Sequence, residues 1–143
     1  MVTLLKGSLS EKFDLLLEGE LFNGSKNYLT GIVIDTGFNG LPNETPIIIP
    51  DNICKELGLV KSKKTLEIWG PLKDKPTKCH TANLGVRLKE DNVTKFEKYS
   101  VTAIILPCQG NGEIIVGPDF LVKVLECKRI IVDYEKYSLT LVI

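Results

Sequence analysis

The sequence has little histidine and no closely spaced pair of cysteines. The single histidine is His80, and the four cysteines are Cys54, Cys79, Cys108 and Cys127. A structural zinc site needs about four ligands at short characteristic spacings, a pattern that these residues do not show, although distant residues can still converge in a fold. We therefore expect no metal and no other cofactor. We interpret the cysteines as buried free thiols, which suits a reducing compartment.

The sequence also has no excess of charge of either sign. Lysine and arginine together number 18, and aspartate and glutamate together also number 18. A chain without net charge sets up no large field toward the phosphates of a nucleic acid or toward an anionic membrane surface. Binding to nucleic acid or to a membrane is therefore not expected.

Long apolar runs are missing as well. No stretch reaches the roughly 18 apolar residues that a helix needs to cross a bilayer. The beginning of the sequence lacks the apolar run of a signal peptide. The sequence therefore predicts a cytoplasmic protein.

Apart from these absences, the composition is that of an ordinary globular domain. Apolar residues make up 43% and charged residues 25% of the 143 residues. A chain of this length buries roughly 68–70% of its unfolded surface, so we expect one domain over residues 1–143. Apolar stretches bounded by turn residues predict strands at about 13–22, 28–35, 47–49, 65–69, 79–88, 96–106, 114–116, 130–134 and 138–143, with short helices at 51–57 and 120–126.

Many short strands with only two short helices indicate an all-β fold, closed or strongly coiled into a barrel. Asp51 is placed to cap the first helix, and Gly58 is placed to follow its last turn. The strands at 65–69 and 79–88 are joined by a polar loop with two prolines. We therefore expect a long hairpin that projects from the barrel.

One segment combines residues that can do chemistry. The apolar run 32–34 is followed at once by Asp35, Thr36 and Gly37. A buried strand that ends in this way places a carboxylate at the mouth of an apolar sheet. The threonine hydroxyl is available to fix the carboxylate, and glycine takes the turn without Cβ strain. Taken alone, such an aspartate could equally well cap a turn.

With its surroundings, this segment resembles the active-site signature of the aspartic proteases, in which two hydrophobic residues precede Asp-Thr-Gly. Downstream, the apolar run 114–116 before Gly117, Pro118 and Asp119 resembles the family's hydrophobic-hydrophobic-Gly-x-Asp/Asn motif. The order of the pieces over residues 28–143 is similar to that of the retropepsin-like aspartic proteases of prokaryotic and cellular type, which are single-domain homodimers. The pieces are 35–40, 49–50, 57–59, 114–121 and 131–134.

The resemblance implies a closed retropepsin-like (acid protease) barrel, with one or two short helices, that hydrolyses peptide bonds without a cofactor. In such enzymes two carboxylates share a proton. One acts as base on a water molecule while its protonated partner donates to the substrate carbonyl. A two-lobed aspartic protease carries two such motifs, whereas this chain carries one. The resemblance therefore implies a homodimer whose two-fold axis brings together two copies of Asp35.

The family's roles carry over residue by residue. Asp35 is the expected catalytic carboxylate, and Thr36 and Gly37 form the expected active-site loop. The hairpin over 65–88 is the expected flap that closes over a peptide or protein substrate. The apolar strands of the cleft suggest hydrophobic residues beside the cleaved bond. Candidates for contact with the substrate, in the flap or after the active-site loop, are Trp69, Gly70, Phe38 and Asn39.

Some of these residues also have structural interpretations. Trp69 can be a core aromatic, Asp119 a cap at the start of a helix and Asp133 a residue at a sheet edge. Cys79 and His80 could form a thiol–imidazole pair, but adjacent residues of a strand point to opposite faces.

Two alternative functions remain open. One is a dimer of the same fold that binds peptides or mediates assembly without cleaving them; the other confines proteolysis to a larger assembly. The intact Asp-Thr-Gly favours the protease, because a binding module would not need a carboxylate pair. The dimer contact is expected to involve the terminal strands, especially 138–143, because they are apolar and rich in β-formers.

Overall fold

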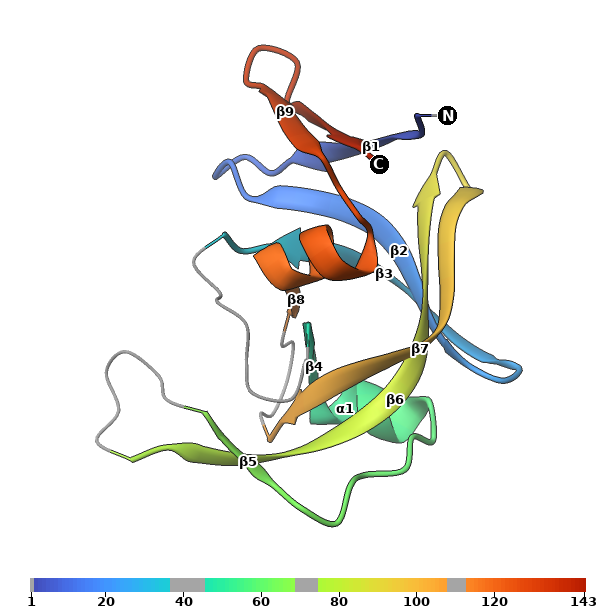
Figure 1. Ribbon diagram of the computed structural model, residues 1–143, viewed down its shortest axis with the longest axis vertical. Helices are drawn as coiled ribbons and strands as arrows, with labels where there is room; N and C mark the ends of the chain where they lie inside the picture. The colour runs from blue at the N-terminus through green and yellow to red at the C-terminus, as the bar shows by residue number, and fades with distance from the viewer. Residues whose placement is uncertain (1, 37–45, 69–74, 108–112) are drawn as a thin grey trace.

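The computed structural model describes residues 2–36, 46–68, 75–107 and 113–143 (Figure 1). Within these residues the chain is mostly β, with two short helices. In chain order the elements are β1 Leu4–Leu9, β2 Leu15–Asn23, β3 Lys26–Ile34, β4 Ile47–Pro50, α1 Asp51–Glu56, β5 Leu66–Ile68, β6 Thr77–Glu90, β7 Val93–Leu106, β8 Ile114–Val116, η1 Phe120–Val124, β9 Arg129–Asp133 and β10 Ser138–Val142.

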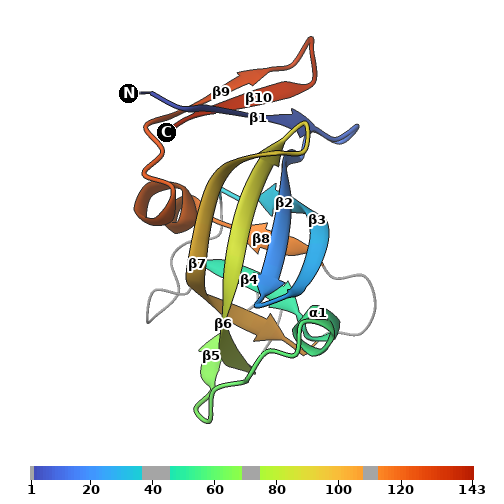
Figure 2. The same ribbon diagram turned by 90° about the vertical axis from the view of Figure 1, so that its right-hand side faces the viewer.

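Six strands close into a barrel. They follow the order β6-β7-β4-β8-β3-β2, and pairing of β2 with β6 completes the ring. The long strands β6 and β7 curve around one side of it (Figure 2). The all-β barrel predicted from the sequence is therefore confirmed.

The core fills the barrel with aliphatic side chains. The short strand β4 is buried along its whole length, because it lies between β7, to which it is parallel, and β8, to which it is antiparallel. This position explains why Ile47, Ile48 and Ile49 form an unbroken apolar run without alternation. Through these two pairings β4 links β7 to β8 within the barrel.

A three-stranded sheet continues from one end of the barrel. In it β10 lies between β1 and β9, and β1 also pairs with β2 (Figure 2). The sequence did not predict β1. Its Gly7 packs so closely on β2 that an added Cβ would collide with the carbonyl oxygen of Leu16. The same glycine weakens the local strand signal, so β1 depends on pairing with distant strands.

The helix α1 confirms one predicted end and corrects the other. Gly58 follows the helix with a φ of 62°, as expected of a glycine after a last turn. Asp51, however, is the first helical residue, and Pro50 occupies the cap position. The Asp51 carboxylate lies 2.7 Å from the Lys61 ammonium and 3.2 Å from that of Lys55. Asp51 therefore fixes the loop after the helix rather than capping its start.

The second helix, η1, lies within the helix predicted over 120–126 and has wider turns than an α-helix. The Leu125 amide donates to the Phe120 carbonyl at 3.0 Å, a bond that spans five residues. Phe120 and Leu121 are buried and dock η1 against the core. Residues 125–128 connect the helix to β9.

One buried carboxylate, Glu20 of β2, is only 6% exposed. It accepts hydrogen bonds from Lys89 Nζ at 2.7 Å and Asn27 Nδ2 at 2.9 Å, and its Oε1 lies 3.4 Å from Arg87 Nη1. The Arg87 guanidinium in turn lies over the Phe22 ring, 3.7 Å from its centroid. This cluster joins β2, β3 and β6 across the outside of the barrel.

We expect the Glu20→Gln variant to lose about 2–3 kcal/mol of unfolding free energy near neutral pH, because Lys89 and Arg87 then lack a carboxylate. The hydrogen bond from Lys89 and then that from Asn27 hold the pKa of Glu20 below its ordinary value, against the opposing effect of burial. A carboxyl with a lowered folded pKa contributes stability that is fully present above its unfolded pKa. That stability is lost as the pH falls through the folded pKa.

Denaturant unfolding at pH 7, 5, 4 and 3 measures this effect. The free-energy difference between wild type and Glu20→Gln should shrink below about pH 4.5. Glu11→Gln, at an exposed loop position, is the matched control and should change stability by less than about 0.5 kcal/mol. A difference that stays constant from pH 7 to pH 3 would contradict the assignment to Glu20.

Candidate active site

Asp35 directly follows β3 at one end of the barrel. β3 pairs in parallel with β8, in the register Ile32 with Ile114 and Ile34 with Val116. Beyond the last pair, the Asp35 amide donates to the Val116 carbonyl at 2.9 Å. The two motifs that resembled the aspartic protease pattern are therefore neighbouring strands, and β8 fixes the backbone that carries the carboxylate.

The residues around Asp35 change from buried to accessible within one step of the chain. Ile32 and Ile34 are buried in the barrel, whereas Asp35 and Thr36 are exposed. The carboxylate thus has an apolar strand behind it and space in front of it, as the sequence predicted. Gly37, Phe38 and Asn39 lie outside the described residues.

An open hollow of about 470 Å³ lies beside Asp35, and we call it the Asp35 pocket. Apolar side chains from β2, β3, β8 and β9 line its interior, including Leu15, Val33, Ile115 and Val132. Polar and aromatic side chains also line it. These are Phe13 and Asp14 from the loop between β1 and β2, Glu113 before β8, and Tyr134 after β9.

A second hollow, the Thr36 pocket, also includes Thr36 and measures about 280 Å³. Its lining is mostly apolar and comes from η1 and the start of β9. Val122, 62% exposed, is part of that lining. The remaining lining residues are Pro118, Leu121, Cys127, Lys128, Arg129 and Ile130. The two pockets differ in charge: carboxylates line the first, and basic residues line the second.

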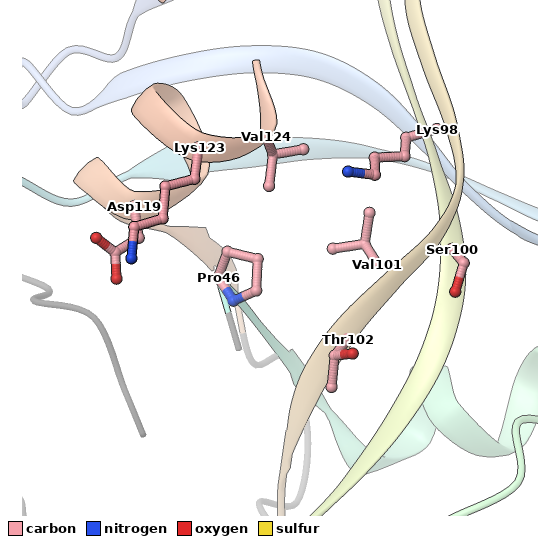
Figure 3. A pocket seen from close by; sticks show the side chains of 8 residues that line it. All are labelled: Pro46, Lys98, Ser100, Val101, Thr102, Asp119, Lys123 and Val124. Carbon is pink, nitrogen blue, oxygen red and sulfur yellow. The ribbon is translucent and has the colours of Figure 1, made fainter. Parts of the chain in front are cut away.

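A smaller and more enclosed hollow of about 220 Å³ lies between η1 and β7 (Figure 3). Lys98 and Lys123 extend along its two sides, and Asp119 lies at its edge. Asp119 stands at the start of η1 as predicted, but its side chain makes no capping hydrogen bond. This hollow is more enclosed than the other two, but Asp35 does not line it. The Asp35 pocket is therefore the better candidate for catalysis.

The hairpin that the sequence analysis assigned to the flap lies partly within the described residues. β5 pairs with β6 in an antiparallel hairpin, with Leu66 opposite Cys79 and Ile68 opposite Thr77. The hairpin extends away from the barrel (Figure 1). Trp69 and Gly70 lie outside the described residues.

Two other candidates have structural partners. Nδ1 of His80 lies 2.8 Å from the carbonyl oxygen of Ser62, while Cys79 is buried. Asp133, at the end of edge strand β9, accepts a hydrogen bond from the Lys136 amide at 3.1 Å and so stabilises the turn to β10. Both arrangements fit the structural interpretations of these residues.

Metal and membrane features were sought only in the described parts of the chain. No group of three or more His, Cys, Asp or Glu side chains there could hold a metal ion. Nor is either described helix long and apolar enough to span a membrane.

Comparison with solved structures identifies the fold. The chain is similar to a retropepsin-like aspartic protease from Rickettsia conorii, with a TM-score of 0.65, 16% sequence identity, and coverage of 99% of this chain and 92% of that one. It also matches the EIAV protease in complex with an inhibitor, with a TM-score of 0.49, 12% identity, and coverage of 87% and 99%. No protein-family model and no curated sequence matches. The first likeness establishes a retropepsin-like fold.

Proposed function

We propose that this chain, whose fold is that of the retropepsin-like aspartic proteases, is an aspartic endopeptidase that acts as a homodimer. One observation carries the proposal. Asp35 is an exposed carboxylate at the end of a buried strand, its amide is bonded to β8, and it borders an open pocket. This arrangement combines a fixed position with access for a substrate.

The chemistry requires two carboxylates with one proton between them. The unprotonated Asp35 takes a proton from water as the water oxygen adds to the peptide carbonyl carbon. The protonated Asp35 of the second copy gives its proton to the carbonyl oxygen. When the C–N bond breaks, the first carboxyl gives its proton to the leaving nitrogen. The second carboxylate takes a proton from one hydroxyl of the tetrahedral intermediate as the new carboxyl group forms, so water and peptide become acid and amine and the pair again holds one proton. Thr36 is proposed to hold the two loops together.

The proposed dimer surface lies around the Thr36 pocket and β9. Val122 and Ile131 are 62% and 54% exposed. Among the described strands, β9 ends the sheet order, so its outer edge pairs with no described strand. These features support a contact with a second copy, since a two-fold axis beside Asp35 would bring this surface against its equivalent.

Residues 138–143, to which the sequence especially assigned the contact, offer it no open strand edge in the described chain. β10 pairs with β1 on one side and with β9 on the other, so both its edges are used within the chain. Its apolar residues Leu139, Leu141 and Val142 are buried in the chain's own structure. The apolar pattern that suggested an interface is explained by the core.

Gly37, Phe38, Asn39, Trp69 and Gly70 keep their roles only as proposals. Gly37 would let the chain approach the substrate backbone. The other four would contact the bound peptide from the flap and from the segment after the active-site loop.

Cleavage of a mixed peptide library, analysed by mass spectrometry, tests the proposal. Wild type and Asp35→Asn are compared at acidic and near-neutral pH, over a series of protein concentrations. A protease active as a dimer gives cleavage that rises with the square of dilute protein concentration and is lost in the variant. No cleavage by a confirmed wild-type dimer would overturn the protease in favour of a peptide-binding module.

A further inference from the structure

The Asp35 pocket has an unusual balance of charge. Three carboxylates line it, those of Asp14, Asp35 and Glu113, and none of its lining residues in the described chain is lysine, arginine or histidine. Lys12 belongs to the same loop as Asp14 but does not line the pocket. The basic residues Lys128 and Arg129 lie in the Thr36 pocket instead. A side chain that enters the Asp35 pocket therefore meets negative charge on several sides.

The loop that contributes Asp14 is held in one shape. Ser10 Oγ accepts from the amides of Lys12 at 3.2 Å and Asp14 at 3.0 Å, and it donates to Asp14 Oδ2 at 3.2 Å. The Ser10 amide also donates to the Asp14 carbonyl at 3.0 Å. These bonds fix the Asp14 carboxylate in its position at the pocket.

The same loop presents an aromatic ring under backbone strain. Phe13 has a φ of 66°, in the left-handed region that bulky residues avoid, yet its side chain is 50% exposed. Its ring stacks on Tyr137 at 5.7 Å and meets Tyr134 edge to face at 5.8 Å. Strained conformations of this kind cluster at ligand-contacting sites. The aromatic group joins the loop after β1 to the turn after β9 at the pocket edge.

We infer that the Asp35 pocket is a subsite for a long basic side chain, lysine or arginine, of the bound peptide. The inference rests on the proposed peptide-cleaving function and deepens it. The aliphatic stem would pack on Leu15, Val33 and Ile115, while the cationic head would face Asp14 and Glu113. Phe13 and Tyr134 also line the pocket and add aromatic surface against which the stem can pack. An acidic side chain would be repelled.

This inference changes the preference expected from the sequence. The apolar strands suggested hydrophobic residues beside the cleaved bond, and they do supply the interior of the pocket. The polar and aromatic rim comes from residues outside those strands. A lysine or arginine satisfies both parts, because its stem is apolar and its end is charged.

A set of peptides tests the subsite. The peptides are identical except for one residue near the cleaved bond, which is lysine, arginine, norleucine or glutamate. Cleavage by wild type should favour lysine and arginine over norleucine by about fivefold, and over glutamate by about 50-fold or more. Glu113→Lys should cut the preference for lysine over glutamate by about fivefold or more, since Glu113 is exposed and the change replaces one of the three carboxylates with a cation. Glu56→Lys, exposed on α1, is the matched control and should keep the wild-type order.

Binding of the same peptides to Asp35→Asn, measured by fluorescence anisotropy, separates the subsite from the chemistry. Wild-type cleavage without a preference for basic residues would overturn the subsite and leave the protease standing. Basic-selective binding that Glu113→Lys weakens in the Asp35→Asn background, with no wild-type cleavage of any peptide, would uphold the subsite and overturn the protease. A preference left unchanged by Glu113→Lys would also overturn the assignment to this pocket.

Discussion

The Asp35→Asn variant is expected to cleave peptides at least about 10³-fold more slowly than wild type, because the substitution removes both carboxylates of a symmetric dimer at once. Asparagine matches aspartate in size but can neither take a proton from water nor return one to the leaving nitrogen. The loss should therefore appear in kcat, while KM changes little. Cleavage kinetics on one library-derived peptide, at the pH of highest wild-type activity, measure both constants.

Folding should be retained in this variant. Asp35 is exposed, and its backbone bond to Val116 is made by the amide, which the substitution keeps. We expect a change in unfolding free energy within about 0.5 kcal/mol. Thermal unfolding and sedimentation check that the variant is folded and has the wild-type oligomeric state.

Asp91→Asn is the matched control for the loss of a carboxylate. Asp91 lies in the tight turn between β6 and β7 with a φ of 50°, a conformation that asparagine also adopts well. The same chemical change there should leave kcat near the wild-type value. Cleavage by Asp35→Asn at the wild-type rate would contradict the proposed mechanism, because the reaction would then depend on another group or another protein.

The features of the candidate site that depend on a few consecutive residues could be predicted from the sequence. The apolar run 32–34 with Asp35 behind it predicted a buried strand that ends in an accessible carboxylate, and the structure has that arrangement. The downstream run 114–116 was predicted as a strand from three residues only. Its parallel pairing with β3 explains why the two motifs occur together.

Features that depend on distant residues could not be predicted in the same way. β1 has a glycine in its middle and no clear alternation, so its identity comes from pairing with β10 and β2. The side chain of Asp51 was assigned to its own helix, but the partner Lys61 lies in the loop beyond. The strand at 138–143 was correctly predicted from its apolar residues. Whether those residues pack into the chain's own core or against a second chain depends on the fold.

The lining of the Asp35 pocket also depends on residues that are distant in the sequence. Phe13 and Asp14 were read as the start of a strand and Tyr134 as the end of another, while Glu113, just before the predicted strand 114–116, was given no role. Only the closure of the barrel and the added sheet brings these four residues to one hollow beside Asp35. One local signal was available: acidic or aromatic residues stand at or directly beside one end of four predicted strands.

Replacement of Val122 with aspartate should weaken the homodimer by at least about 100-fold in Kd, and cleavage at dilute protein concentration should fall with it. The side chain lines the Thr36 pocket on η1 and is 62% exposed, so the change removes little packing within one chain. In the dimer it would put two carboxylates into the proposed contact, and like charges brought together at an interface cost several kcal/mol. A 100-fold change in Kd corresponds to about 2.7 kcal/mol.

Sedimentation velocity over a range of concentrations measures the dimer Kd, and the cleavage rate is followed in the same samples. Val60→Asp is the matched control, because Val60 is 87% exposed in the loop after α1 and lines neither the Asp35 pocket nor the Thr36 pocket. Activity of Val122→Asp that recovers at high protein concentration would tie the loss to dissociation, since a complete site needs two chains. An unchanged Kd would instead place the contact away from η1, and activity lost with the dimer intact would make Val122 part of the substrate path.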